Sequence, residues 1–411
     1  MSAIAERAGF DESDATHRAG RRPWTRLDVT ADIAELEADW RALEATGLVT
    51  PYQSFDWVTP YLRTVAKAHG EDIRLVCVRD SRDTLVAILP LHLTRRNGVR
   101  FAEFIGGKHA NYHMGIYAPA FAKALDSAST EQLLREAAVL FGQIDAFVFV
   151  NQPPEWDGIA NPMALLAGGH SPSRAYKLKL VPGQCEATLN RSMSSHARKK
   201  HKNKRNRFAD HGTSQMVQAD TPEQVDTILA DFLAQKAARF AGMGVPDPFA
   251  DPAIRTFLRE AALPRPDGRP PVIELTTLNV EGACVATYVG AVHRTRFSGM
   301  ATSFAMGGEI AKTSPGEILL VDLIKRKCHS GIETFDLGVG DARYKTTICD
   351  EKDDLVDSFF AVTAKGRAYA HFSRWKRALK GAIKQNPTAL KIAQRASGLL
   401  RGRRQQASAE D

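Results

Sequence analysis

Residues 313–320, with the sequence TSPGEILL, contain residue types suited to holding an anion. Ser314 is expected to cap a helix, Pro315 fits its first position, and Glu317 completes a capping box with Ser314. Gly316 has no side chain that would block access to the backbone amides of the first turn. Because free N–H groups and the positive end of the helix dipole meet there, such a terminus favours a phosphate. The alternative interpretation is a well-capped core helix without a ligand.

A glycine-rich loop follows the next expected strand and carries an acid, a phenol and an amine. It lies within FDLGVGDARYK, residues 335–345. Tyr344 could donate a proton, and Asp336 or Asp341 could accept one or hold an amine. Lys345 could bind a phosphate or a carboxylate of a substrate. A helix start that binds an anion, followed by such a loop, is suited to an enzyme that uses an acyl-CoA. The alternative is that Asp341 is a turn residue, that the Tyr344 ring packs in the core and that Lys345 is solvated at the surface.

These two segments resemble a known enzyme family. SPGEILL and FDLGxGDxxYK are similar to the GNAT-related acetyltransferases associated with bacterial cellulose and exopolysaccharide synthesis (the CelD/BcsL type), which are related to FemAB-like aminoacyltransferases. The resemblance extends to QSFDW at residues 53–57, to AILPL at residues 87–91 and to a basic run near residue 200. It therefore covers most of the chain, from about residue 35 to about residue 365.

The resemblance implies that an acetyl group moves from acetyl-CoA to an amine of a sugar or polysaccharide precursor. In this chemistry the amine attacks the thioester directly and Tyr344 protonates the leaving thiolate, while Asp336 or Asp341 handles the proton of the amine. Transfer to a hydroxyl stays open, because Asp341 or His109 could serve as the stronger base that a hydroxyl requires. Two further alternatives are FemAB-like aminoacyl transfer from tRNA and a non-catalytic regulator of a polysaccharide synthase.

The coenzyme A site is expected at the start of the helix. The Arg/Gln-x-x-Gly-x-Gly/Ala loop of many GNAT enzymes is absent from the sequence. Lys312, Ser314, Gly316 and Glu317, together with the helix amides, are expected to take its place.

A basic run occupies residues 191–207, with eight lysines and arginines and no acid. On a helix capped by one of the preceding serines, Lys199, Lys202 and Arg205 would share one face. Like charges placed so closely predict an anionic substrate, such as a sugar nucleotide, a lipid-linked diphosphate or an acidic glycan. No aromatic residue interleaves the run, so nucleic acid is not expected, except for tRNA under the aminoacyl-transfer alternative. A solvated, highly charged helix is the other possibility.

The loop GGKHANYH at residues 106–113 is a second candidate substrate surface. We expect His109 and Tyr112 to face the substrate, with an ordinary loop as the alternative. His109 and His113 are four residues apart, which on a helix could bind a metal. The flanking glycines favour a loop, however, and no carboxylate is close in sequence, so no metal is expected.

The elements that would position these residues occur twice in one order: strand, strand, strand, helix, strand. The expected ranges are 73–79, 85–93, 99–105, 129–141 and 146–150 in the first half, and 272–278, 283–292, 296–304, 315–329 and 334–337 in the second. This order is the core of a GNAT unit. The sequence therefore predicts an α/β protein with a tandem duplicated GNAT-like acyl-CoA N-acyltransferase fold and mixed central sheets. Between the halves, a helix capped by Thr221 is expected. Gln235, Lys236 and Arg239 near its end are expected to be solvated, with a role in substrate binding as the alternative.

Composition and charge divide the chain further. It has 411 residues, 44% of them hydrophobic and 25% charged, which is typical of globular proteins. The expected divisions are a disordered segment over residues 1–25, units over 26–180 and 181–363, and a basic tail over 364–411. The net charge of +8 comes from the basic run and from residues 365–404, which hold twelve lysines and arginines and no acid.

Cysteine usage and hydropathy bear on the location. The five cysteines have no paired spacing, which argues against a disulfide framework and favours a reducing compartment. No apolar run is long enough to cross a bilayer, so a cytoplasmic protein is expected. In the tail, Phe372, Trp375 and Leu379 would form an apolar stripe beside basic residues. This pattern suits either peripheral contact with the anionic inner face of the cytoplasmic membrane or a helix packed on the domain.

Overall fold

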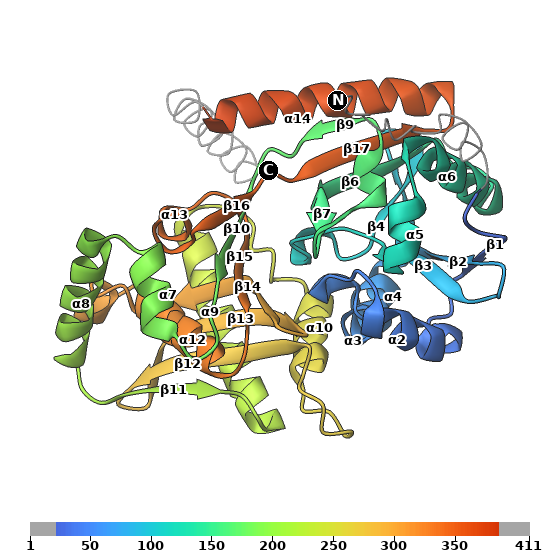
Figure 1. Ribbon diagram of the computed structural model, residues 1–411. Coiled ribbons are helices and arrows are strands. Elements are labelled where there is room, and N and C mark those ends of the chain that lie inside the picture. Colours follow the sequence, from blue (N-terminus) through green and yellow to red (C-terminus); the bar gives the residue numbers. More distant parts are fainter. Residues whose placement is uncertain (1–21, 386–411) are drawn as a thin grey trace, which may run out of the picture.

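A computed structural model describes residues 22–385 and contains two mixed β-sheets, each with helices packed against it (Figure 1). The first sheet has the strand order β1-β2-β3-β4-β6-β17-β9, with β5 paired to β3. Its strands are β1 (Arg26–Thr30), β2 (Asp72–Arg79), β3 (Leu85–Arg96), β4 (Val99–Phe104), β5 (Ile116–Tyr117), β6 (Ala146–Gln152), β9 (Gly168–His170) and β17 (Val356–Ala361). A separate two-stranded ribbon consists of β7 (Glu155–Trp156) and β8 (Ile159–Ala160).

The second sheet has the order β11-β12-β13-β14-β15-β10-β16. Its strands are β10 (Ala175–Lys179), β11 (Ser214–Gln218), β12 (Ile273–Val280), β13 (Ala283–His293), β14 (Arg296–Phe304), β15 (Thr334–Val339) and β16 (Glu351–Asp353). In both sheets the third strand of the expected repeat pairs in parallel with the closing strand, β4 with β6 and β14 with β15. The predicted duplication of mixed sheets is therefore confirmed.

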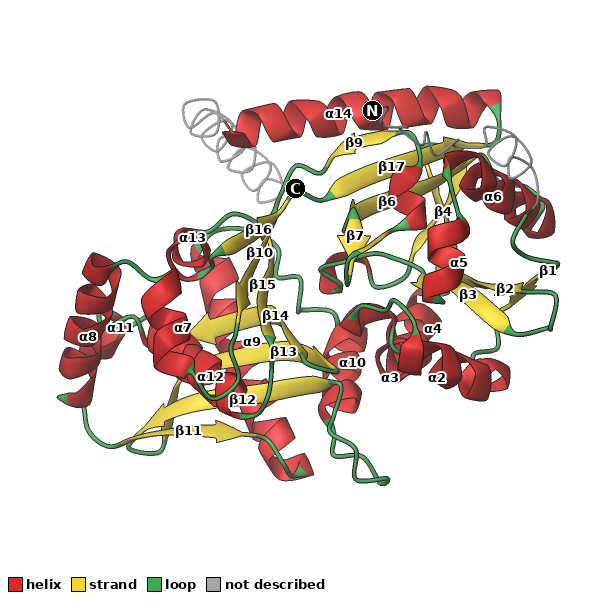
Figure 2. Cartoon of the chain, in the orientation of Figure 1, coloured by secondary structure: helices red, strands yellow, loops and turns green. Residues whose placement is uncertain are grey.

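Helices cover both sheets (Figure 2). Those of the first half are α2 (Glu37–Thr46), α3 (Phe55–Tyr61), α4 (Lys67–His69), α5 (Pro119–Ala124) and α6 (Ser127–Phe141). Those of the second half are α7 (Cys185–Ser192), α8 (Ser195–Ala209), α9 (Pro222–Gly242), α10 (Pro252–Ala262), α11 (Gly308–Ala311), α12 (Pro315–His329) and α13 (Arg343–Ile348). The last helix, α14 (Ala364–Gln385), returns to the first sheet and lies over β9 and β17 (Figure 1).

The two halves exchange strands. β10 follows the first sheet along the chain but pairs with β15 and β16 of the second sheet. β17 follows the second sheet but pairs with β6 and β9 of the first. The expected boundaries at residues 180 and 363 stay a prediction, and each of the expected units contains one strand that pairs with the sheet of the other half. We propose units of residues 26–170 with 356–385, and of residues 175–353.

The two halves also share a hydrophobic core. Trp57 is fully buried, and its ring meets that of Phe257 on α10 edge to face at 4.9 Å. Tyr61 stacks on Trp57 and also meets Phe257 edge to face. Such aromatic pairs add to the free energy of burial. One core cluster therefore runs from the first sheet across α3 into α9 and α10.

Candidate functional site

A cavity of about 220 Å³ lies beside the start of α12 and collects several of the residues singled out in the sequence. It is enclosed by β13, β14, the first turns of α12 and the start of α13. Its lining residues are Tyr288, Thr302, Phe304, Ala311, Ser314, Gly316, Glu317, Leu320 and Tyr344. The structure therefore brings Ser314, Gly316, Glu317 and Tyr344 together, although Tyr344 comes from the loop after the next strand.

The helix start differs from the expected capping box. Ser314 adopts a left-handed conformation, with φ of 62°, and its side chain makes no capping hydrogen bond. Its backbone carbonyl instead accepts from the amides of Glu317, at 2.9 Å, and Ile318, at 3.3 Å. The prediction of a capping box was wrong, because the left-handed backbone turns the serine side chain away from the first-turn amides.

Gly316 faces the cavity next to an aromatic ring. A Cβ atom at this position would lie 3.1 Å from Cδ1 of Phe304, which is closer than ordinary van der Waals contact. The missing side chain therefore leaves room both for the ring and for a ligand beside the first turn of the helix.

The Glu317 carboxylate holds the basic helix against α12. It accepts from Lys204 Nζ at 2.5 Å and lies 3.8 Å from His201 Nδ1. Interaction with His201 and Lys204 lowers the pKa of Glu317 to about 2. An ion pair between Arg205 and Asp322 adds a second link between the helices. Glu317 is thus an anchor for α8 and does not cap α12.

The basic run does form a helix, α8, with Ser194 as its cap (Figure 2). Lys199 and Lys202 are exposed on it, whereas Arg205 is turned towards α12. Lys199, Lys202 and Arg205 therefore do not share one exposed face, contrary to the prediction from the sequence. Packing on α12 selects the face that holds Lys204, Arg205 and the buried Phe208.

The strands β14 and β15 separate beneath the cavity. Their parallel pairing is limited to three residue pairs, from Arg296 with Thr334 to Ser298 with Asp336. The register of β14 against β13 also shifts, so that Met300 is an extra residue between Gly299 and Ala301. Such a bulge bends a strand away from its neighbour, and it leaves a gap between two strand ends.

Asp336 lies at the point of separation and is fully buried. Its carboxylate accepts from Ser298 Oγ at 2.9 Å and from the Gly338 amide at 2.6 Å. It is absent from the cavity lining, so these bonds give it a role in joining β14 to β15. A catalytic role for Asp336 remains a prediction.

Lys345 and Asp341 also lie away from the cavity lining. Lys345 is buried and donates to the carbonyls of Gly338, at 3.0 Å, and Val339, at 3.2 Å, and burial lowers its pKa. A substrate contact would require those bonds to break. Asp341 accepts from Tyr176 Oη at 2.6 Å and lines a different depression. The structure therefore separates Asp341 from Tyr344.

Two phenols face the cavity. Burial raises the pKa of Tyr344, and burial raises the pKa of Tyr288 well above its usual value. Both phenols therefore keep their protons at neutral pH and can act as proton donors. Tyr288 was missed in the sequence, where a tyrosine inside an apolar strand looks like core. The glycine at position 299 is a sequence signal for this tyrosine, because a Cβ atom at Gly299 would lie 2.3 Å from Tyr288 Oη.

Lys312 lies outside the cavity. Its side chain is exposed and pairs with Glu309 at 2.5 Å. It belongs to the solvent-facing turn between α11 and α12. The expected coenzyme contact of Lys312 stays a prediction.

The loop of residues 106–113 meets the second half. Asn111 Nδ2 donates to Gly299 O at 2.9 Å and to Tyr52 Oη at 2.6 Å. Tyr112 is buried, and burial and the Asp336 carboxylate raise its pKa well above the usual value. Asn111 and Tyr112, which belong to the first half, thus occupy the space where β14 and β15 separate. This places Tyr112 in a buried contact and not on the expected open surface.

His109 lies at the edge of the same loop. Its ring meets that of Phe249 edge to face at 5.7 Å, and burial with the neighbouring Lys108 lowers its pKa to about 4. His113 is buried and its Nδ1 lies 3.0 Å from Val150 O. Across residues 22–385 no group of three or more potential metal ligands is present.

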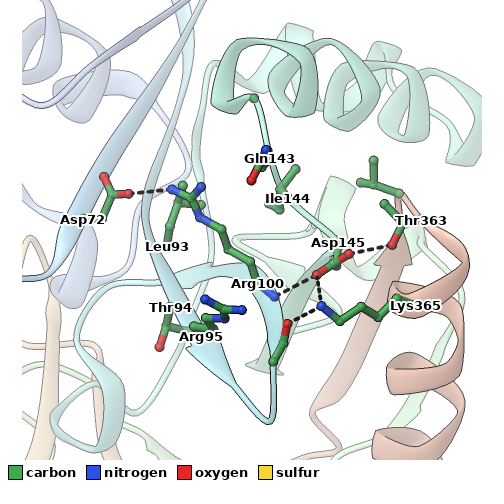
Figure 3. Close-up of a pocket in the computed structure, with 13 residues that line it drawn as sticks. Asp72, Leu93, Thr94, Arg95, Arg100, Gln143, Ile144, Asp145, Thr363 and Lys365 are labelled. Atoms are coloured by element: carbon green, nitrogen blue, oxygen red, sulfur yellow. Dashed lines mark hydrogen bonds and ion pairs between the residues drawn. The ribbon is translucent and has the colours of Figure 1, made fainter.

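A larger cavity, of about 650 Å³, lies at the end of the first sheet near the start of α14 (Figure 3). Its charged groups largely pair with each other, Arg100 with Asp72 at 3.0 Å and Lys365 with Asp145 at 3.5 Å. It contains none of the residues singled out in the sequence. The cavity beside α12 is therefore the candidate site.

Residues 195–346 match the acetyltransferase (GNAT) domain. The matched segment begins at α8, ends within α13 and contains every residue that lines the cavity. The chain is an acyltransferase, and this part of it is similar to the GNAT acetyltransferase domain. A comparison with proteins of established function found no match.

Solved structures resemble the chain over most of its length. FemX is 11% identical, with a TM-score of 0.56, and the similarity covers 84% of this chain and 99% of FemX. The C-terminal domain of a putative lysylphosphatidylglycerol synthetase from Agrobacterium fabrum is 13% identical, with a TM-score of 0.47 and coverage of 83% and 95%. A tandem GNAT protein from the clavulanic acid biosynthesis pathway is 12% identical, with a TM-score of 0.39 and coverage of 81% and 98%. At these identities the likeness to FemX shows the fold alone.

Proposed function

We propose that the chain transfers an acyl group, most simply acetyl from acetyl-CoA, to an amine of a sugar or polysaccharide precursor. The observation that supports this most is the cavity in which Gly316, the start of α12 and the phenol of Tyr344 meet beside the separated strands β14 and β15. Its volume of about 220 Å³ is below the range of about 300–1,000 Å³ for sites that enclose a whole drug-sized ligand. It is suited to the thioester end of the donor, with the nucleotide outside.

The two phenols supply the proton that the reaction needs. The neutral amine attacks the thioester carbonyl, the new C–N bond forms, and the C–S bond breaks. The leaving thiolate takes its proton from Tyr344 or Tyr288, both of which stay protonated at neutral pH. The proton lost by the amine passes to solvent, and the phenol is reprotonated from solvent.

The donor phosphates are proposed to lie at the start of α12. The amides of the first turn and the helix dipole favour an anion there. Glu317 opposes an anion, but Lys204 neutralises its charge at 2.5 Å. Lys199 and Lys202 on the exposed side of α8 are proposed contacts to an anionic substrate.

Aminoacyl transfer from tRNA is a second candidate, favoured by the exposed lysines of α8 and by the fold shared with FemX. Under this reaction the basic helix would contact tRNA phosphates. A role in cellulose or exopolysaccharide synthesis, catalytic or regulatory, rests on the sequence resemblance.

Peripheral contact with an anionic membrane is proposed for α14. Phe372, Trp375 and Leu379 are exposed along one side, at 56%, 61% and 46%, next to basic residues such as Arg374 and Lys376. This composition suits an interfacial helix. Within residues 22–385 no helix is long and apolar enough to cross a membrane.

Calorimetry with acetyl-CoA tests the proposed donor site. Gly316→Val puts a branched side chain against Phe304 and into the cavity, so it is expected to abolish binding while the fold persists. Thr46→Val, at the exposed end of α2, is the control and is expected to bind normally. Unchanged acetyl-CoA affinity in a folded Gly316→Val protein would place the donor site elsewhere. Tight binding of aminoacyl-tRNA with no binding of acetyl-CoA would favour the second candidate.

A further inference from the structure

The last turns of α9 carry two cations that are held among aromatic rings. Lys236 Nζ lies 5.4 Å from the ring centre of Phe249 and 5.6 Å from that of Phe232. The Arg239 guanidinium lies 5.1 Å from the ring centre of Phe304, which lines the cavity beside α12. Both side chains are half-buried and do not form the solvated helix end expected from the sequence.

Neither cation has an acidic partner within the described part of the chain. Across residues 22–385, no carboxylate oxygen lies within 4.0 Å of Lys236 or Arg239. Burial and the neighbouring Arg239 lower the pKa of Lys236 to about 8, although the charge of Asp247, farther than 4.0 Å away, acts in the opposite direction. Partial burial of a cation without an acidic partner costs free energy. The aromatic rings and the negative end of the helix dipole offset only part of this cost. The arrangement is therefore suited to receiving an anion.

The pair lies between the cavity and the first half of the chain. Arg239 contacts Phe304 on the cavity side, and its charge acts on Tyr344. Lys236 contacts Phe249, which also meets His109 from the first half. These contacts place the two cations against a wall of the cavity and against the first half of the chain. The donor phosphates, by contrast, are proposed to lie at the start of α12.

We propose that Lys236 and Arg239 bind an anionic group of the acceptor, either a phosphate or a carboxylate. The inference rests on the proposed acyl transfer and narrows the acceptor to an amine that also carries a negative charge. Arg239 presents a planar pair of donors to the anion, and Lys236 contributes a point charge one turn earlier on the helix.

Titration of the full chain with inorganic pyrophosphate tests the site directly. The double variant Lys236→Met/Arg239→Gln is expected to bind pyrophosphate at least 10-fold more weakly than the wild type at low salt. Arg82→Gln/Lys123→Met, which removes two exposed cations of the first half, changes the net charge equally and should leave binding unchanged. Equal affinity in the wild type and the α9 variant, or an equal loss in the control, would overturn the proposal.

Acetyl-CoA binding separates this proposal from the proposed function. The α9 variant is expected to bind acetyl-CoA as tightly as the wild type. If acetyl-CoA binding falls together with pyrophosphate binding, the cations belong to the donor and the acceptor assignment is wrong. If acetyl-CoA fails to bind even to the wild type, the proposed function fails while the pyrophosphate result still decides whether the anion site exists. The single variant Arg239→Gln provides the same comparison where the double variant does not fold.

Discussion

Tyr288 and Tyr344 face the same cavity, so the proton donor must be distinguished by substitution. If Tyr344 protonates the thiolate, Tyr344→Phe is expected to lower kcat by a factor of about 10²–10⁴, while acetyl-CoA affinity stays within about twofold. Tyr288→Phe would then have the smaller effect on kcat. Steady-state kinetics together with calorimetry checks both statements. A larger loss of kcat in Tyr288→Phe would assign the proton to the strand tyrosine.

Lys236 gives the anion site a defined pH dependence. Its folded pKa is about 8, so the ammonium is present below that value and is lost as pH rises through it. Pyrophosphate affinity is therefore expected to fall between pH 7 and pH 9. Lys236→Arg keeps its charge over this range and should remove most of the fall. An identical pH profile in Lys236→Arg would show that another group titrates.

At the scale of elements, Glu317 links α8 to α12. Its folded pKa of about 2 lies below the ordinary value, so the linkage stabilises the fold above the unfolded pKa and is lost as pH falls through about 2. Glu317→Gln is expected to reduce the free energy of unfolding at pH 7 by about 1–3 kcal/mol. The difference from wild type should shrink at pH 3.

Urea denaturation at the two pH values measures this. Glu309→Gln removes an exposed carboxylate paired with Lys312 and should change stability by less than about 0.5 kcal/mol. A Glu317→Gln protein as stable as wild type at pH 7 would show that the buried Phe208 and the pair of Arg205 with Asp322 hold α8 without Glu317.

Element positions could be predicted well from the sequence. The expected ranges 296–304 and 315–329 coincide with β14 and α12, because hydrophobic period and helix-end signals are local. Of the residues expected in the site, Ser314, Gly316, Glu317 and Tyr344 line one cavity, whereas Lys312, Asp336, Asp341 and Lys345 lie outside it. Tyr288, Asn111 and the inward turn of Lys345 could not be predicted, because each depends on contacts between segments far apart in the chain.

At the scale of the whole molecule, α14 offers an exposed apolar stripe on a docked helix. Its other side is fixed to the first sheet, where Tyr369 stacks on Phe101 at 5.2 Å and Arg377 pairs with Asp357. Phe372→Ser/Trp375→Ser should therefore leave the fold intact and reduce co-sedimentation with anionic liposomes. Binding of the wild type should weaken with added salt and be absent with neutral lipid.

Val139→Ser/Leu140→Ser is the matched control for this measurement. These residues are also exposed and apolar, at 79% and 51%, but they lie on α6. This control should pellet like the wild type. If the full chain stays in the supernatant with anionic liposomes at low salt, the stripe has another role.

The strand exchange has a consequence for synthesis on the ribosome. β6 ends at Gln152, but β17, which pairs with it, is complete only at Ala361. At about 5–20 residues per second, roughly 10–40 s pass before the missing strand emerges. During that interval the edge of β6 is unpaired and open to wrong pairing, as exposed strand edges generally are. The nascent chain therefore carries an incomplete first sheet until Ala361 has been made.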